Sequence, residues 1–149
     1  MIDVTGFTFD QAVSSVIHEE DDIISSLANY SSIYMQFYKP HWVGFYLVKQ
    51  DFMSLGPFQG PMACSKIKKG KGVCGRAWDT KEVQNIADVH QFPGHIACSG
   101  LTNSELVIPL IKDGKVWAIF DIDRITYGYF EKDHIDLIQK TLNKLNDCF

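Results

Sequence analysis

Three of the four cysteines lie where their surroundings suggest chemistry. Cys98 lies in the irregular stretch HQFPGHIACSG at 90–100, and loops on a rigid scaffold commonly carry reactive groups. Cys74 stands at the start of an expected helix, where either a lowered thiol pKa or the role of a small buried hydrophobic residue fits. Cys64 falls in an expected strand. Such a set of thiols suits attack on an electrophile, closure of a disulfide and reset by an external dithiol.

Two strands at 104–111 and 115–123, joined at 112–114, carry acidic residues that could serve the same chemistry. A two-residue turn would set apolar residues of one strand against charged residues of the other. A three-residue loop with its glycine left-handed instead pairs Leu106 with Phe120, so this is the predicted register. The core-facing residues are then Leu106, Ile108, Leu110, Val116, Ala118 and Phe120.

This register sets Glu105 opposite Asp121, with Asp123 one diagonal step away on the same face. Crowded carboxyl groups cannot all ionise cheaply, so at least one pKa should rise and supply a proton donor, while ionised neighbours hold an ammonium group. A solvated sheet face would carry the same residues. Trp42 and Tyr46 share one side of an earlier strand, where they either wall a small pocket or belong to the core.

A zinc site would have to combine the three cysteines with His90 or His95. The sequence contains no CxxC or HxxxH spacing, so no metal site is predicted. Cys148, beside the C-terminus, is expected to be incidental. The two histidines are expected to orient the loop or to face solvent.

The elements that must position these residues suggest an α+β fold. Apolar residues recur at helical spacing from Phe9 to Ile17 and again from Ile23 to Phe37, where Asp21 or Asp22 could cap the second helix. A period of two begins at Trp42. Further expected elements are strands at 52–57, 62–67 and 83–86, a short helix at 73–79 and a final helix at 130–145.

Composition excludes several classes of protein. The chain has 149 residues, of which 46% are hydrophobic and 21% charged, as in an ordinary globular protein. A net charge of −4 without a basic stripe argues against nucleic acid or an anionic membrane as a partner. With no signal-peptide pattern and no long apolar run, we expect a cytoplasmic protein whose thiols are not structural disulfides.

Six motifs follow one another along the chain: HWVGFYL at 41–47, LGPFQGPMAC at 55–64, GKGVCG at 70–75, ADVHQFPGHIAC at 87–98, NSELVIPL at 103–110 and DID at 121–123. Together they resemble the GAF-domain free methionine-(R)-sulfoxide reductases. The resemblance implies a single GAF domain over residues 1–149. In that fold the N- and C-terminal helices pack on one face of a central antiparallel sheet, and loops cover a pocket on the other.

The resemblance also implies roles for particular residues. Cys98 would attack the sulfur of free methionine sulfoxide, Cys64 would resolve the product as a disulfide, and Cys74 would be an auxiliary thiol. Thioredoxin would be the reductant, and no cofactor would be needed. Backbone amides at 96–98 would receive the substrate carboxylate, whereas Ser99 departs from the acid often found there. The acids Glu105, Asp121 and Asp123 and the aromatic residues Trp42 and Tyr46 would bind the substrate.

An alternative remains for a GAF fold, which is a non-catalytic module that binds a small molecule or senses redox state. Such a module would not need the full set of thiols and acids. The amphipathic terminal helices could form a homodimer face, although packing on the sheet explains their apolar stripes equally well.

Overall fold

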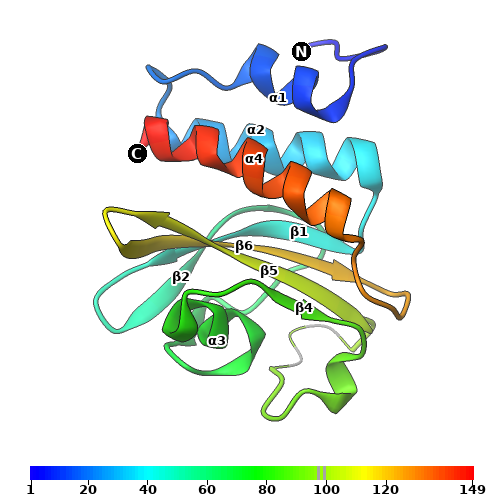
Figure 1. Cartoon of the computed structure of the whole chain (residues 1–149), viewed down its shortest axis with the longest axis vertical. Helices are drawn as coiled ribbons and strands as arrows, with labels where there is room; N and C mark the ends of the chain where they lie inside the picture. Colours follow the sequence, from blue (N-terminus) through cyan, green and yellow to red (C-terminus); the bar gives the residue numbers. More distant parts are fainter. Residues whose placement is uncertain (97, 99) are drawn as a thin grey trace.

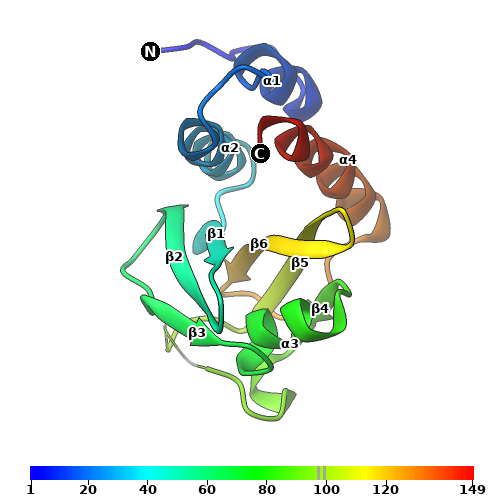
Figure 2. The same ribbon diagram turned by 90° about the vertical axis from the view of Figure 1, so that its left-hand side faces the viewer.

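The computed structural model describes residues 1–96, 98 and 100–149. They form a six-stranded antiparallel sheet with helices or loops packed on each of its faces (Figure 1). The strand order is β3-β2-β1-β6-β5-β4. Helices α2 and α4 cover one face, with α1 packed outside them, while α3 and the long loop lie on the other face (Figures 1 and 2). The predicted fold class is confirmed. The elements are α1 Phe9–Val16, α2 Ile23–Tyr38, β1 Trp42–Val48, β2 Phe52–Gln59, β3 Lys66–Lys68, α3 Gly72–Thr80, β4 Gln84–Ile86, the 3-10 helix η1 Val89–Gln91, β5 Ser104–Lys112, β6 Lys115–Arg124 and α4 Lys132–Cys148.

The helical layer forms the main core with one face of the sheet. Thr8 and Gln11 make a capping box at the start of α1, and the Asp22 side chain accepts hydrogen bonds from the first turn of α2. In the core, Tyr30 packs edge-on against Phe120 of β6, and its hydroxyl lies 2.7 Å from the Thr141 hydroxyl of α4. In the described part of the chain no helix is long and apolar enough to cross a bilayer.

The β5–β6 hairpin corrects the predicted register. Its turn has two residues, Asp113 and Gly114, both with positive φ, and Lys112 pairs with Lys115. A bulge follows, in which Ile111 pairs with Val116 and Leu110 pairs with Ala118, so that Trp117 is an extra residue on β6. The short turn and the bulge together move the pairing by two residues, so Glu105 faces Asp123 instead of Asp121. A shift of two preserves the side to which each residue points.

The bulge also explains one wrong core assignment. Val116 belongs with the residues under α3, while Trp117 and Ala118 both join the helix-side core. Without the bulge, a two-residue turn would have set core against charge, so the sequence pattern alone favours the longer loop.

An irregularity in strand pairing also changes the bounds of the strand predicted at 52–57, and the strand predicted at 62–67 is shorter than expected. The predicted strand at 52–57 continues to Gln59, because Gly56 and Pro57 are accommodated at an irregularity in the pairing of β1 with β2. The next strand is short, and Cys64 lies in the loop before it instead of in a strand.

Candidate active site

The floor of the site is the sheet face opposite the three-helix layer. Trp42 of β1, Asp123 of β6 and Glu105 of β5 form one row across three neighbouring strands. In the next row, Asp121 lies beside Gly44. The predicted convergence of the three acids on one face is therefore observed, with a different pair directly opposite. They line a cavity of about 570 Å³, including its open mouth.

Helix α3 closes one side of this cavity and brings Cys74 to the acids. Its close fit requires Gly75, because a Cβ there would lie 2.7 Å from the Lys68 carbonyl oxygen. The Cys74 thiol donates to Glu105 Oε1 over 3.9 Å. Burial, followed by the charges of Asp121 and Glu105, raises the pKa of Cys74 well above its ordinary value. Of the two alternatives for this cysteine, the structure favours a buried protonated thiol, because these effects outweigh the helix N-terminus.

The three carboxyl groups are difficult to ionise together. Burial and the charge of Asp123 raise the pKa of Glu105 to about 8. Burial, then the neighbouring carboxylates, raise the pKa of Asp121 and Asp123 well above the ordinary range. Moreover, Asp121 Oδ1 is buried without a hydrogen-bond partner among the described residues. The floor is thus suited to retain protons and to receive a cationic or hydrogen-donating group.

Two loops meet over the cavity through a disulfide. Cys64 follows β2, Cys98 lies in the long loop before β5, and their sulfur atoms are bonded. Cys98 lines the cavity and is exposed on its outer side, whereas Cys74 remains a free thiol. The three cysteines singled out in the sequence therefore gather around one cavity. Cys148 lies apart, with its thiol donating to the carbonyl of His18.

The aromatic wall also holds the loop that carries Cys64. Trp42 Nε1 donates to the carbonyl of Pro61 over 3.0 Å, and the Tyr46 hydroxyl donates to the carbonyl of Cys64 over 3.0 Å. Both rings line the cavity, and Trp42 stacks on Phe58. The sequence left open whether Trp42 and Tyr46 wall a pocket or belong to the core. Both rings do both, because they are buried and also line the cavity.

His95, expected from the sequence to orient the loop or to face solvent, lies in the site. Its Nε2 lies 3.4 Å from Glu105 Oε2, and the imidazole lines the cavity three residues before Cys98. Burial lowers the pKa of His95, so its ring is neutral at neutral pH while Glu105 retains its proton. In the sequence, the feature that could have identified His95 as a site residue is its closeness to Cys98. His90 instead contacts Asn103 at the base of the loop, in agreement with an orienting role.

One predicted feature lies partly outside the described residues. The backbone amides proposed to receive a carboxylate span 96–98, and Ala97 is not described. The same holds for Ser99, whose departure from the family pattern was noted above.

Comparisons with known proteins agree with this geometry. The GAF domain family model matches residues 22–146. The free methionine-R-sulfoxide reductase of Saccharomyces cerevisiae is 43% identical over 133 residues, covering 81% of this chain and 74% of the relative. Its Escherichia coli counterpart is 45% identical over 112 residues, covering 74% and 68%.

A solved structure extends the similarity to the whole fold. The free methionine-R-sulfoxide reductase of Neisseria meningitidis, in complex with its substrate, superposes with a TM-score of 0.89 at 37% identity. The superposition covers 95% of this chain and 85% of that one.

Proposed function

The chain belongs to the GAF-domain free methionine-R-sulfoxide reductases, a family of oxidoreductases, and from this membership we propose that it reduces free L-methionine-R-sulfoxide in the cavity described above. The observation that carries the proposal is the disulfide between Cys64 and Cys98 beside a floor of buried acids. It supports a reaction in which thiols supply two electrons and acids supply protons.

The proposed chemistry begins with Cys98. Its sulfur attacks the sulfoxide sulfur, acquires the oxygen as a sulfenic acid and releases methionine. The Cys64 thiol then attacks the sulfenic sulfur, which forms the disulfide and releases the oxygen as water. Two thiols are oxidised for each sulfoxide reduced.

The acids account for the proton demand of this reaction. A sulfoxide oxygen is a poor leaving group until it is protonated, and Glu105, with a pKa of about 8, holds a proton at neutral pH. Asp121 and Asp123 surround the same space and are proposed to bind the substrate ammonium group. Entry of that cation would favour ionisation of one carboxyl group, so substrate binding and proton release are coupled.

The remaining walls suit the apolar end of a methionine side chain. Trp42 and Tyr46 offer aromatic surface, and we propose that they pack on the methyl and methylene groups of the substrate. Their hydrogen bonds to the Cys64 loop would then couple substrate contact to the position of the resolving cysteine.

Recycling requires an external dithiol, for which we propose thioredoxin. Cys98 is exposed in the disulfide form, so a protein thiol can reach its sulfur. Cys74 is buried and is proposed to act only by exchange inside the cavity. A cytoplasmic location, where such dithiols are kept reduced, is part of this proposal.

We further propose that two copies associate through the terminal helices. Phe7, just before α1, and Ile24, in the first turn of α2, are exposed and support such a face. Light scattering during size-exclusion chromatography would give twice the chain mass, whereas a single-chain mass would contradict the dimer.

The substrate assignment is tested by turnover coupled to thioredoxin. We expect consumption of free L-methionine-R-sulfoxide, little or none of the S epimer, and little of a methionine sulfoxide embedded in a peptide. Equal rates on both epimers, or stoichiometric binding of the R epimer without its consumption, would contradict the proposal and favour a sensing module.

A further inference from the structure

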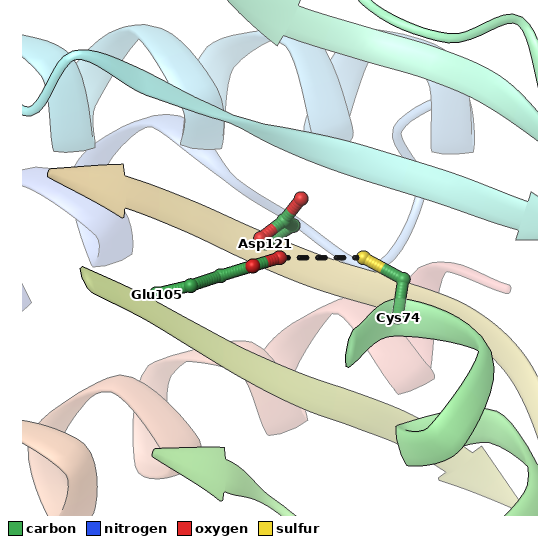
Figure 3. A group of neighbouring side chains, drawn as sticks. All are labelled: Cys74, Glu105 and Asp121. Atoms are coloured by element: carbon green, nitrogen blue, oxygen red, sulfur yellow. Dashed lines mark hydrogen bonds between the residues drawn. The ribbon is translucent and has the colours of Figure 1, made fainter. Parts of the chain in front are cut away.

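Three different donor atoms converge on one point of the cavity floor. The ligand-type atoms of Cys74, Glu105 and Asp121 all lie within 4.8 Å of one another. They come from α3, β5 and β6, and Figure 3 shows their side chains turned toward a common space. The three residues are only 4–6% exposed.

One oxygen atom of this cluster has no hydrogen-bond donor or cation beside it in the described structure. Asp121 Oδ1 is buried and makes no hydrogen bond within the described chain. A third acid, Asp123, pairs with Glu105 across the strands and adds to the negative character of the floor. A buried carboxyl oxygen without a hydrogen-bond donor is costly whether or not the group is ionised, so the free oxygen marks a position for a donor or a cation.

The donor set selects among cations. Calcium takes six to eight oxygen ligands, and magnesium requires an octahedral shell of oxygens, which a thiol and two carboxylates do not supply. Zinc binds sulfur and oxygen together in a tetrahedron, with bonds of about 2.0–2.3 Å. Such bonds place neighbouring ligand atoms about 3.3–3.8 Å apart. The Cys74 Sγ to Glu105 Oε1 distance of 3.9 Å therefore needs only a small adjustment.

We propose that Cys74, Glu105 and Asp121 bind one zinc ion in the disulfide form of the protein and that this ion excludes methionine sulfoxide from the cavity. Cys74 binds as a thiolate after releasing its proton to solvent, and no electron is transferred. The fourth position of the ion faces the cavity. Zinc binding does not rest on the proposed function, whereas the exclusion of substrate does.

The disulfide form makes the test specific. With Cys64 and Cys98 bonded to each other, Cys74 and Cys148 are the two remaining thiols. Metal-free oxidised protein is titrated with Zn²⁺ in competition with a chromophoric chelator. We expect one ion per chain, binding at least about tenfold weaker in Cys74→Ser and in Asp121→Asn, and affinity within twofold of wild type in Cys148→Ser.

Cobalt gives a readout that does not depend on a variant. Co²⁺ added to the unmodified oxidised protein should produce the absorption of a thiolate-to-metal charge transfer, displaced by one equivalent of Zn²⁺. Absence of this band, unchanged zinc affinity in Cys74→Ser, or loss of binding in Cys148→Ser would each overturn the site.

Competition between zinc and methionine sulfoxide tests whether the bound ion excludes the substrate from the cavity. Free L-methionine-R-sulfoxide should weaken the apparent zinc affinity of the oxidised protein, and Zn²⁺ affinity independent of the sulfoxide would overturn exclusion. Intact zinc binding in a protein without reductase turnover would instead contradict the proposed function and leave the metal site standing.

Discussion

At the scale of single residues, Glu105 is the acid whose proton is most informative. Its pKa rises to about 8 from an ordinary value of 4.5, so the folded protein holds a proton there that the unfolded chain releases between these values. Folding stability therefore falls as pH rises from about 5 to 8, because the native state binds the extra proton.

The variant Glu105→Gln should weaken this dependence. We expect the free energy of unfolding of the wild type to drop by an amount on the order of a few kcal/mol across that interval, and that of the variant to drop less. Denaturant titrations at several pH values measure it. An equal or steeper drop in the variant would show that Glu105 is not the group responsible.

His95 supplies a second prediction at this scale. It contacts the acid Glu105, whereas His90 contacts Asn103 at the loop base, so the two histidines form a matched pair. His95→Gln should lower kcat/KM about tenfold and move the midpoint of its pH profile, because removal of the imidazole changes the surroundings of the proton donor. His90→Gln should change kcat/KM by less than about threefold. An equal loss of kcat/KM in the two variants would contradict a specific role for His95 and indicate a general disturbance of the loop.

The residues that the sequence identified were those with a chemical signal of their own. Cys64, Cys74 and Cys98 were visible as thiols, and parity alone placed the acids on one face. The contact between His95 and Glu105 was not predictable, because it depends on how an irregular loop folds back over the sheet, for which the sequence carries no period.

At the scale of elements, the β5–β6 hairpin shows how a wrong register can still give the correct face. A two-residue turn opposes core and charge if the strands pair without interruption, and the bulge at Trp117 removes that conflict. Bulges lack a reliable sequence signature, so the pairing was wrong by two residues. Since two is the period of a strand, the site composition was unaffected.

Gly44 is the position on β1 where packing and site meet. A Cβ there would lie 2.3 Å from Phe58 Cβ and 2.8 Å from the Trp42 ring, and the residue pairs with Asp121 across the sheet. Gly44→Ala should therefore lower the free energy of unfolding by about 1–3 kcal/mol and weaken substrate binding, because Trp42 must move.

The matched control is Gly100→Ala, where an added Cβ meets no atom within 4 Å. Its free energy of unfolding should remain within about 0.5 kcal/mol of wild type. Thermal or denaturant unfolding of both variants gives the comparison. A Gly44→Ala variant as stable as Gly100→Ala would contradict the close approach of Phe58 and Trp42 to Gly44.

At the scale of the whole molecule, the protein is divided by function. The helical layer and its aromatic core stabilise the sheet, while the opposite face carries loops joined by the Cys64–Cys98 disulfide. This bond closes a sequence separation of 34 residues. Catalysis of the proposed kind requires that it open and close without disturbing the helical layer.

Reduction of the disulfide should consequently act locally. We expect a loss of about 2–4 kcal/mol in the free energy of unfolding, from release of the closed segment. Amide hydrogen exchange should accelerate in 60–66, 88–96 and 100–103 and remain unchanged in α2 and α4. The double variant Cys64→Ser, Cys98→Ser should be insensitive to dithiothreitol. Faster exchange throughout the helices would contradict this division.

The central claim is that Cys98 removes the sulfoxide oxygen and Cys64 resolves the product. The most direct test is a single turnover, in which prereduced protein is mixed with excess L-methionine-R-sulfoxide without a reductant and methionine is quantified. The proteins are compared in a Cys74→Ser background, because exchange with Cys74 would free Cys98 for a second turnover. In that background the otherwise unmodified protein should yield about one equivalent and end as the Cys64–Cys98 disulfide. Cys64→Ser should yield one equivalent with Cys98 as a trappable sulfenic acid, and Cys98→Ser should yield none. Methionine formed by Cys98→Ser at the wild-type level would contradict the account.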